Sequence, residues 1–252
     1  MSRIDTIFSG DKKALMPFLV AGYPTIESTE EAIIAMDEAG ADIIEIGIPF
    51  SDPIADGPVI AAAMHQALQK GVTPAHAIGV VSRIRDRVSA GLVAMVSESI
   101  VHRSGGSVFL DRLVEAGFDG VIIPDIDDLD AENISAYCSG CGLTFSMLVS
   151  PTTPPNRIEW LASISTGFLY VLARVGLTGE QAALPDITKR IAEIRALTNL
   201  PLAVGFGIST REHVESVTQT ADAAIVGSAL VRRMSTTDNP AAAARDFVRE
   251  LS

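Results

Sequence analysis

Positive charge is scarce in this sequence. Its 252 residues include 19 lysines and arginines against 31 aspartates and glutamates, which gives a formal net charge of −12. A nucleic-acid backbone is bound through clustered lysines and arginines, so the composition argues against a nucleic-acid partner. The one short basic series, Arg83, Arg85 and Arg87, is predicted to form the solvent-facing side of a helix.

Long apolar runs are also absent. No stretch approaches the ~18 uninterrupted apolar residues that a membrane span needs. The first residues, MSRIDTIFSGDKK, lack the apolar centre of a signal peptide. The sequence therefore predicts a cytoplasmic protein with no membrane partner.

Cysteine and histidine are too few and too dispersed to indicate a metal centre. Cys138 and Cys141 form a CxxC pair, but the second half of a zinc site is missing, and a redox motif would open the first helix after a strand. We expect this pair at the end of a helix, before Gly142. No metal is predicted, because the histidines have no mutual ligand spacing; they are His65, His76, His102 and His213.

Apolar residues are abundant, at 48% of the sequence, and they are arranged in short runs. The runs recur at intervals of roughly 25–30 residues and alternate with stretches of helical periodicity, which is the pattern of repeated βα units. Their continuous hydrophobicity is typical of parallel strands that are buried on both faces. The predicted strands are 15–20, 43–47, 92–96, 119–123, 144–149, 168–172, 201–204 and 223–226.

Two architectures accommodate such units. An open doubly wound sheet usually has a GxGxxG loop after its first strand, and none follows Val20. We therefore predict an α/β fold of the closed (β/α)8 TIM-barrel type, with residues 1–252 as a single domain. In such barrels the catalytic groups lie at the C-terminal ends of the strands.

The segment 44–58, IEIGIPFSDPIADGP, carries the strongest signal for chemistry. It places Glu45 inside an apolar strand, where a carboxylate is costly to bury. Either Glu45 is a hydrogen-bonded core residue, or it is a proton carrier whose pKa the pocket adjusts. Asp52 and Asp56 follow in a turn rich in proline and glycine, and turn formation alone accounts for Asp52.

Two strand ends run into glycine just before a helix. They are AVGFGIS at 203–209, with Gly205 and Gly207, and AIVGSAL at 224–230, with Gly227 and Ser228. Glycine lets backbone N–H groups approach an anion, a helix N-terminus adds positive partial charge, and barrels commonly bind phosphate after strands 7 and 8. The alternative is that glycine only shapes each turn, but two adjacent pairs favour a phosphate site.

Lysine is excluded as a covalent nucleophile. A Schiff-base aldolase needs a lysine at the C-terminal end of a strand. None of the lysines falls at such a position; they are Lys12, Lys13, Lys70 and Lys189.

The segment IEIGIPFSDPIADGP resembles the signature of the tryptophan synthase α subunit family. The resemblance extends over nearly the entire chain and includes MPFLVAGYP at 16–24, GFLYVLARVGLTG at 167–179, GFGIS at 205–209 and VGSALV at 226–231. It implies a lyase that cleaves indole-3-glycerol phosphate to indole and glyceraldehyde 3-phosphate by a retro-aldol reaction, without a cofactor. It also implies a β-subunit partner, in an α2β2 complex, that converts indole to tryptophan.

Matching by motif gives each site residue an expected role. The catalytic pair falls on Glu45, for proton transfer at indole C3 and the glycerol hydroxyl, and on Asp56, for the indole N–H. The phosphate is expected among Gly179, Gly207, Gly227 and Ser228. Thr178 would orient the catalytic aspartate, and the indole pocket would be lined by Phe18, Ile60, Tyr170 and Phe206, for which ordinary barrel packing is the alternative.

The chain departs from the family pattern in two places. The end of the third strand reads MVSESIV at 95–101, where relatives usually carry a tyrosine, and we expect Glu98 to face the carboxylate pair there, with Ser97 or Ser99 as the alternative. The loop 124–130, PDIDDLD, lacks a proline that is common after the family's aspartate.

Two other functions remain open at this stage. One is a catalytically weak barrel that acts mainly as the allosteric partner of a tryptophan synthase β subunit. The other is a different phosphate-binding barrel, such as an isomerase of the same biosynthetic route, although such enzymes do not carry the SDPIADGP loop.

Overall fold

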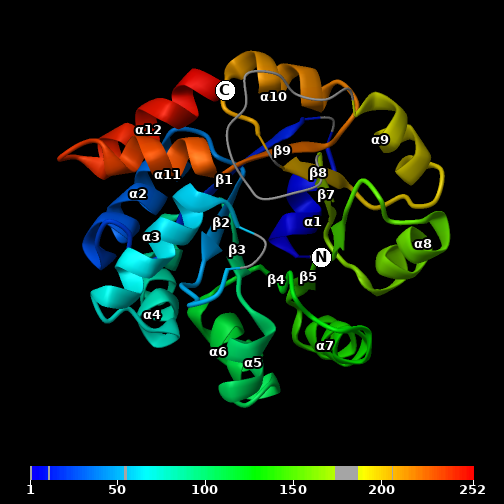
Figure 1. Ribbon diagram of the computed structural model, residues 1–252, viewed down its shortest axis with the longest axis horizontal. Helices are drawn as coiled ribbons and strands as arrows, with labels where there is room; N and C mark the ends of the chain where they lie inside the picture. The colour runs from blue at the N-terminus through cyan, green and yellow to red at the C-terminus, as the bar shows by residue number, and fades with distance from the viewer. Residues whose placement is uncertain (1, 11, 54–55, 174–186, 206) are drawn as a thin grey trace.

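Parallel strands form the centre of the molecule and helices surround them (Figure 1). The computed structural model describes residues 2–10, 12–53, 56–173, 187–205 and 207–252. The strands are β1 (Ala14–Val20), β2 (Ile43–Gly47), β3 (Gly91–Met95), β4 (Gly120–Ile122), β5 (Thr144–Phe145), β6 (Leu148–Val149), β7 (Leu169–Leu172), β8 (Leu202–Gly205) and β9 (Ala223–Val226).

The helices begin with α1 (Arg3–Phe8), α2 (Ile26–Glu38), α3 (Pro58–Gln69), α4 (Pro74–Ile84), α5 (Glu98–Arg103) and α6 (Ser107–Ala116), with a 3₁₀ turn at Arg85–Arg87. They continue with α7 (Asp128–Cys141), α8 (Pro155–Ile164), α9 (Thr188–Arg195), α10 (Arg211–Thr218), α11 (Ser228–Ser235) and α12 (Pro240–Leu251). Within the described residues no helix is long and apolar enough to cross a membrane.

The strands close into the predicted barrel. β1 pairs with β2 on one side and with β9 on the other, so the first and last strands are neighbours. β5 pairs with β4, and β6 pairs with β7. Because β5 and β6 are two halves of the predicted strand 144–149, the hydrogen bonding runs around the whole ring.

The prediction of one continuous strand at 144–149 is wrong. Hydroxyl groups from the segment before β7 take the place of strand ladder bonds: the amide of Phe145 donates to Thr166 Oγ1 at 2.9 Å, and the amide of Met147 donates to Ser165 Oγ at 3.2 Å. The side chains interrupt the ladder, so the strand divides into β5 and β6.

The alternation of side chains along each strand separates two apolar cores. Ile44 and Ile46 of β2 belong to a core between the sheet and the surrounding helices. Ile43 belongs to a smaller core inside the barrel, together with Ile4 of α1, which covers the N-terminal ends of the strands. Since side chains two residues apart point to the same face, Glu45 also points into the barrel.

The N-terminal ends of the strands are held by three aspartates. Asp42, Asp119 and Asp222 each lie at or next to the start of a strand and accept a hydrogen bond from the backbone N–H of a neighbouring strand, at Leu15, Leu92 and Leu202 respectively. Each also pairs with at least one cation; the pairs are Lys12 with Asp42, Arg3 and Arg85 with Asp119, and Lys13 and Arg195 with Asp222.

The prediction that Arg85 faces solvent is wrong. Its side chain is 13% exposed. Besides Asp119, its guanidinium donates to the carbonyl oxygens of Gly117 at 3.3 Å and Ala90 at 2.9 Å. Arg85 therefore belongs to the N-terminal ion pairs, whereas Arg83 pairs with Glu30 at the surface, as a solvent-facing residue does.

Candidate active site

Strand β2 places Glu45 inside the barrel, where it is completely buried. Its neighbours across the ladder are Phe18 of β1 and Val93 of β3. Neither carboxyl oxygen of Glu45 has a hydrogen-bond partner among the described residues. Burial, together with the charge of Asp56, raises the pKa of Glu45 to about 8. At neutral pH Glu45 is therefore mostly protonated.

Asp56 lies in the loop between β2 and α3, directly before Gly57, the N-cap residue of α3. Burial raises the pKa of Asp56 to about 6. This carboxyl group is therefore mostly ionised at neutral pH. The sequence-predicted pair is brought close enough for the charge of Asp56 to act on Glu45.

Tyr170 of β7 lies near enough to the two carboxyl groups for their charges to act on its hydroxyl. It points into the barrel and is 7% exposed. Burial first, and then the charges of Glu45 and Asp56, raise its pKa well above the usual value. Gly205 of β8 leaves room for the ring, because a Cβ atom at this glycine would lie 2.6 Å from the hydroxyl of Tyr170.

Phe18 and Ile60 pack beside the end of β9. A Cβ atom built on Gly227 would be in ordinary contact with both side chains, at 3.4 Å from Phe18 and 3.6 Å from Ile60. The ring of Phe18 also fills the space above Gly47, where a Cβ atom would lie at 2.6 Å. The two predicted pocket residues are therefore adjacent to Gly227, one of the predicted phosphate ligands.

The other described phosphate candidates lie at the C-terminal ends of β8 and β9. Gly227 is the N-cap residue of α11, and Ser228, which is buried, is the first residue of that helix. Gly207 has a φ of 82°, a conformation that favours glycine. Three predicted site residues, Thr178, Gly179 and Phe206, lie outside the described residues.

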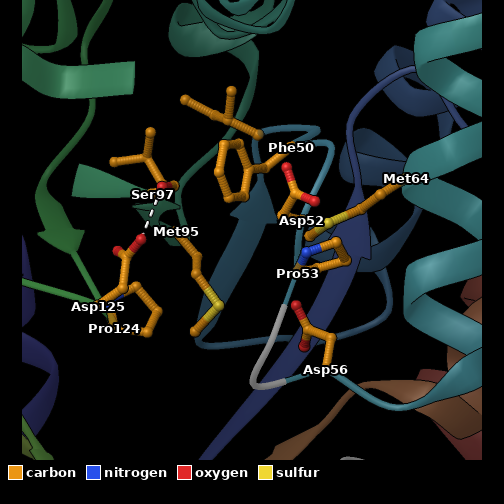
Figure 2. Close-up of a pocket in the computed structure, with 11 residues that line it drawn as sticks. Phe50, Asp52, Pro53, Asp56, Met64, Met95, Ser97, Pro124 and Asp125 are labelled. Atoms are coloured by element: carbon orange, nitrogen blue, oxygen red, sulfur yellow. Dashed lines mark hydrogen bonds between the residues drawn. The ribbon is translucent and has the colours of Figure 1, made fainter. Parts of the chain in front are cut away.

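A pocket opens next to Asp56, on the side that faces strands β3 and β4 (Figure 2). The pocket is open to solvent, and its space amounts to about 400 Å³ when the solvent at its mouth is included. Its lining is mainly apolar, with the polar groups of Asp52, Asp56, Ser97 and Asp125. The apolar lining residues are Ile48, Phe50, Pro53, Met64, Met95, Val96 and Pro124.

The expectation that Glu98 faces the carboxylate pair is wrong. Glu98 is the first residue of α5 and lines a separate groove with residues of α6 and α7, such as Leu110 and Tyr137. Ser97, the N-cap residue of α5, lines the pocket instead. The chain turns from strand to helix between Met95 and Glu98. The two-residue alternation of the strand therefore no longer determines where the side chain of Glu98 points.

Sequence reasoning missed Met95 and Asp125 as pocket residues. Met95 ends β3 and Asp125 follows β4, so both occupy strand ends, where barrels place their functional side chains. Their position at strand ends is the feature of the sequence from which both could have been predicted. Asp125 accepts hydrogen bonds from the hydroxyl of Ser97 at 2.7 Å and from the amide of Glu98 at 2.8 Å.

No cluster of three metal-ligating side chains occurs among the residues that the structure describes. The CxxC pair lies at the end of α7, which Gly142 caps, as expected. Cys138 is buried and Cys141 is partly buried. Burial raises the pKa of the Cys138 thiol to about 12, so the thiol stays protonated and unreactive.

The arrangement of the carboxylates suits proton transfer. Two carboxyl groups whose environments give different pKa values can divide the roles of acid and base at one pH. Glu45 can supply a proton near neutral pH, and Asp56 can accept a hydrogen bond from a donor that becomes positively charged. Tyr170, Phe18 and Ile60 supply apolar surface beside them.

Known proteins resemble this chain over its whole length. The profile of the family described as "Tryptophan synthase alpha chain" matches residues 5–251. A relative of that name from Prochlorococcus marinus (strain MIT 9313) is 40% identical over 235 residues, which are 92% of this chain and 86% of the relative. One from Dehalococcoides mccartyi (strain BAV1) is 38% identical over 252 residues, which are 100% of this chain and 98% of the relative.

Solved structures agree with the sequence relatives. The tryptophan synthase subunit alpha from Legionella pneumophila superposes with a TM-score of 0.91 at 32% identity, covering 100% of this chain and 97% of that one. A structure of tryptophan synthase from Mycobacterium tuberculosis gives a TM-score of 0.91 at 32% identity, covering 99% and 96%.

Proposed function

We propose that this chain, which belongs to the tryptophan synthase alpha chain family and is a lyase of tryptophan biosynthesis, cleaves the carbon–carbon bond of indole-3-glycerol phosphate with Glu45 and Asp56. The products are indole and glyceraldehyde 3-phosphate. The observation that carries the residue assignment is a pair of carboxylates, Glu45 buried and Asp56 partly buried, with separated pKa values of about 8 and about 6.

Bond cleavage requires two proton movements. Indole C3 gains a proton, and the hydroxyl on the carbon being released loses one as that carbon becomes an aldehyde. We assign both to Glu45, which gives its proton to C3 and takes the hydroxyl proton, so it returns to its starting state. Such general acid–base catalysis contributes typically ~100-fold to ~10,000-fold in rate.

Asp56 is assigned to the indole N–H. Protonation at C3 places positive charge on the indole ring, and an ionised carboxylate at the ring nitrogen stabilises that charge. The lower pKa of Asp56 supports this role, because the group is ionised while Glu45 is still protonated.

The phosphate is assigned to Gly207, Gly227 and Ser228, with Gly179 as a fourth contributor from outside the described residues. Support comes from the position of Gly227 and Ser228 at the N-terminus of α11, where backbone N–H groups are free of helix partners. In this way an acidic protein binds an anionic substrate through backbone dipoles.

The proposal extends to a β-subunit partner in an α2β2 complex and to a location in the cytoplasm. Members of this family work with a β subunit, and no feature of the described residues favours the alternative of a catalytically weak partner barrel. Co-elution of this chain with its cognate β subunit, at the mass of two copies of each, tests the complex.

The direct test of the catalytic proposal is the formation of indole and glyceraldehyde 3-phosphate from indole-3-glycerol phosphate. Glu45→Gln and Asp56→Asn are each expected to lower turnover by at least ~100-fold while the protein stays folded. Asp127→Asn is the control, since Asp127 does not line the pocket and asparagine keeps the N-cap of α7. Near-native turnover in either catalytic variant would remove the role assigned to that residue.

A further inference from the structure

The side-chain oxygens on the wall of the pocket opposite Asp56 are available as hydrogen-bond acceptors. The hydroxyl of Ser97 donates to Asp125 Oδ2 at 2.7 Å, because an ionised carboxylate only accepts. Ser97 Oγ lies 3.1 Å from Ser99 Oγ, so Ser99 is the donor in that contact. Asp125 Oδ1 accepts from the amide of Glu98. Each of these oxygens keeps acceptor capacity for a further partner.

This acceptor pair shares the pocket with Asp56. Figure 2 shows Asp56 on one side of the pocket, the hydrogen-bonded Ser97 and Asp125 on the other, and the side chain of Met95 between them. Ser97 is 8% exposed and is the N-cap residue of α5. The surface between the two polar groups is apolar, with Met64, Met95 and Pro124.

A flat bicyclic ring fits this distribution. An indole whose N–H lies on Asp56 and whose pyrrole ring lies beside the predicted pocket residues Phe18 and Tyr170 would extend its benzo ring along this apolar lining. Its outer edge would then face the side where Ser97 and Asp125 lie (Figure 2). An unsubstituted ring leaves those acceptors to water. A ring substituent that donates a hydrogen bond gives them a partner.

We propose that Ser97 and Asp125 determine specificity for the indole ring and make the site accept rings that carry a hydroxyl or amino group on the benzo ring. The inference rests on the proposed function, since it takes indole as the ring held by Asp56. A methyl group has the size of a hydroxyl but no proton to donate, and a carboxylate is repelled by Asp125. The acceptors therefore select by hydrogen-bond donation rather than by size.

The test uses the reverse reaction of the full chain. Indole and glyceraldehyde 3-phosphate condense, with loss of the C3 proton and protonation of the aldehyde oxygen. The kcat/KM values are compared for hydroxyindoles and methylindoles substituted at positions 4, 5, 6 and 7. At one position or more, the hydroxy compound is expected to exceed its methyl partner by about tenfold, the size of one hydrogen bond to a charged group.

Two variants locate the effect. Ser97→Ala removes one acceptor, and Asp125→Asn replaces a carboxylate oxygen by a donor while still accepting from the amide of Glu98. Each is expected to lower the hydroxy-to-methyl ratio at least threefold. Asp127→Asn is the control: it lies in the same loop, does not line the pocket, and keeps its N-cap function for α7 because asparagine caps as well as aspartate. This variant keeps the ratio.

The outcomes separate this inference from the proposed function. Condensation of unsubstituted indole, with hydroxy-to-methyl ratios at or below one at all four positions, overturns the inference and leaves the proposed function intact. Ratios that neither variant changes also overturn it. Failure of the parent chain to turn over unsubstituted indole overturns both.

Discussion

The two ends of the barrel hold carboxylates in opposite environments. At the N-terminal end, Asp119 and Asp222 have a backbone N–H and cationic partners. At the C-terminal half, Glu45 has no hydrogen-bond partner among the described residues, and burial raises its pKa. The partnered carboxylates hold strands together, whereas the unpartnered carboxylate retains a proton that it can transfer.

The free energy of burial accounts for this difference. Removing a carboxylate from water is costly unless a cation and hydrogen bonds compensate. For Asp222, burial raises the pKa, but hydrogen bonds from Arg195 and the amide of Leu202 outweigh it and the pKa falls below its usual value. Glu45 lacks such compensation and remains a cost to stability at neutral pH. The barrel thus separates stabilising from reactive carboxylates by position along the strands.

The largest expected effect on stability comes from breaking the partnered end. Asp119→Ala leaves the guanidinium of Arg85, which is 13% exposed, without its carboxylate and the amide of Leu92 without its acceptor. We expect a loss of about 3 kcal/mol in the free energy of unfolding, measured by urea titration. Cleavage activity stays within about twofold while the protein is folded, because this end of a barrel serves stability.

Glu30→Ala is the control for this prediction. It removes the surface pair with Arg83 and is expected to cost less than ~1 kcal/mol. Equal effects of the two substitutions would show that the N-terminal ion pairs have no special weight.

A smaller effect of opposite sign is expected at the unpartnered end. The folded pKa of Glu45 is about 8, above its usual 4.5, so this group favours the folded state at low pH, and its contribution is lost as pH rises through 8. Glu45→Gln removes the charge and is expected to stabilise the fold by roughly 2 kcal/mol at pH 6, at ~1.4 kcal/mol for each pH unit above the usual pKa. The gain is close to zero at pH 4 and grows up to pH 8.

Urea titrations of both proteins across this pH range measure the difference. A Gln variant that is less stable than the parent at pH 8, or a difference that does not grow with pH, would contradict the picture of an uncompensated carboxylate.

The smallest effect is expected at the proposed phosphate site. Ser228→Ala removes one hydroxyl at the start of α11 and leaves the backbone N–H groups in place. We expect KM for indole-3-glycerol phosphate to rise about threefold to tenfold with kcat unchanged, the pattern of a lost binding contact. Steady-state kinetics decides the point, and an unchanged KM would show that the hydroxyl of Ser228 makes no contact with the phosphate.

The same comparison explains what the sequence predicts well. The strands are recognisable because both of their faces pack against apolar side chains, as Ile44 outside and Ile43 inside the barrel illustrate. Glu45 stands out for the same reason, since a charged residue interrupts an otherwise apolar strand. Position in the barrel then indicates which strand ends carry chemistry.

Other features depend on contacts that no local pattern contains. The break between β5 and β6 arises from hydroxyls of Ser165 and Thr166. The burial of Arg85 depends on Asp119, far along the chain. Glu98 was misplaced because helix α5 begins at that residue and its direction follows the helix rather than the strand.

The pH dependence of kcat/KM for indole-3-glycerol phosphate cleavage tests the central claim most directly. If Asp56 acts ionised and Glu45 acts protonated, the profile is a bell with limbs near the pKa values of about 6 and about 8, which belong to the interacting pair in the free enzyme. The residual activity of Glu45→Gln then lacks the alkaline limb. A profile that is flat between those values and beyond, or a Gln variant that keeps the alkaline limb, would contradict the division of labour between the two carboxylates.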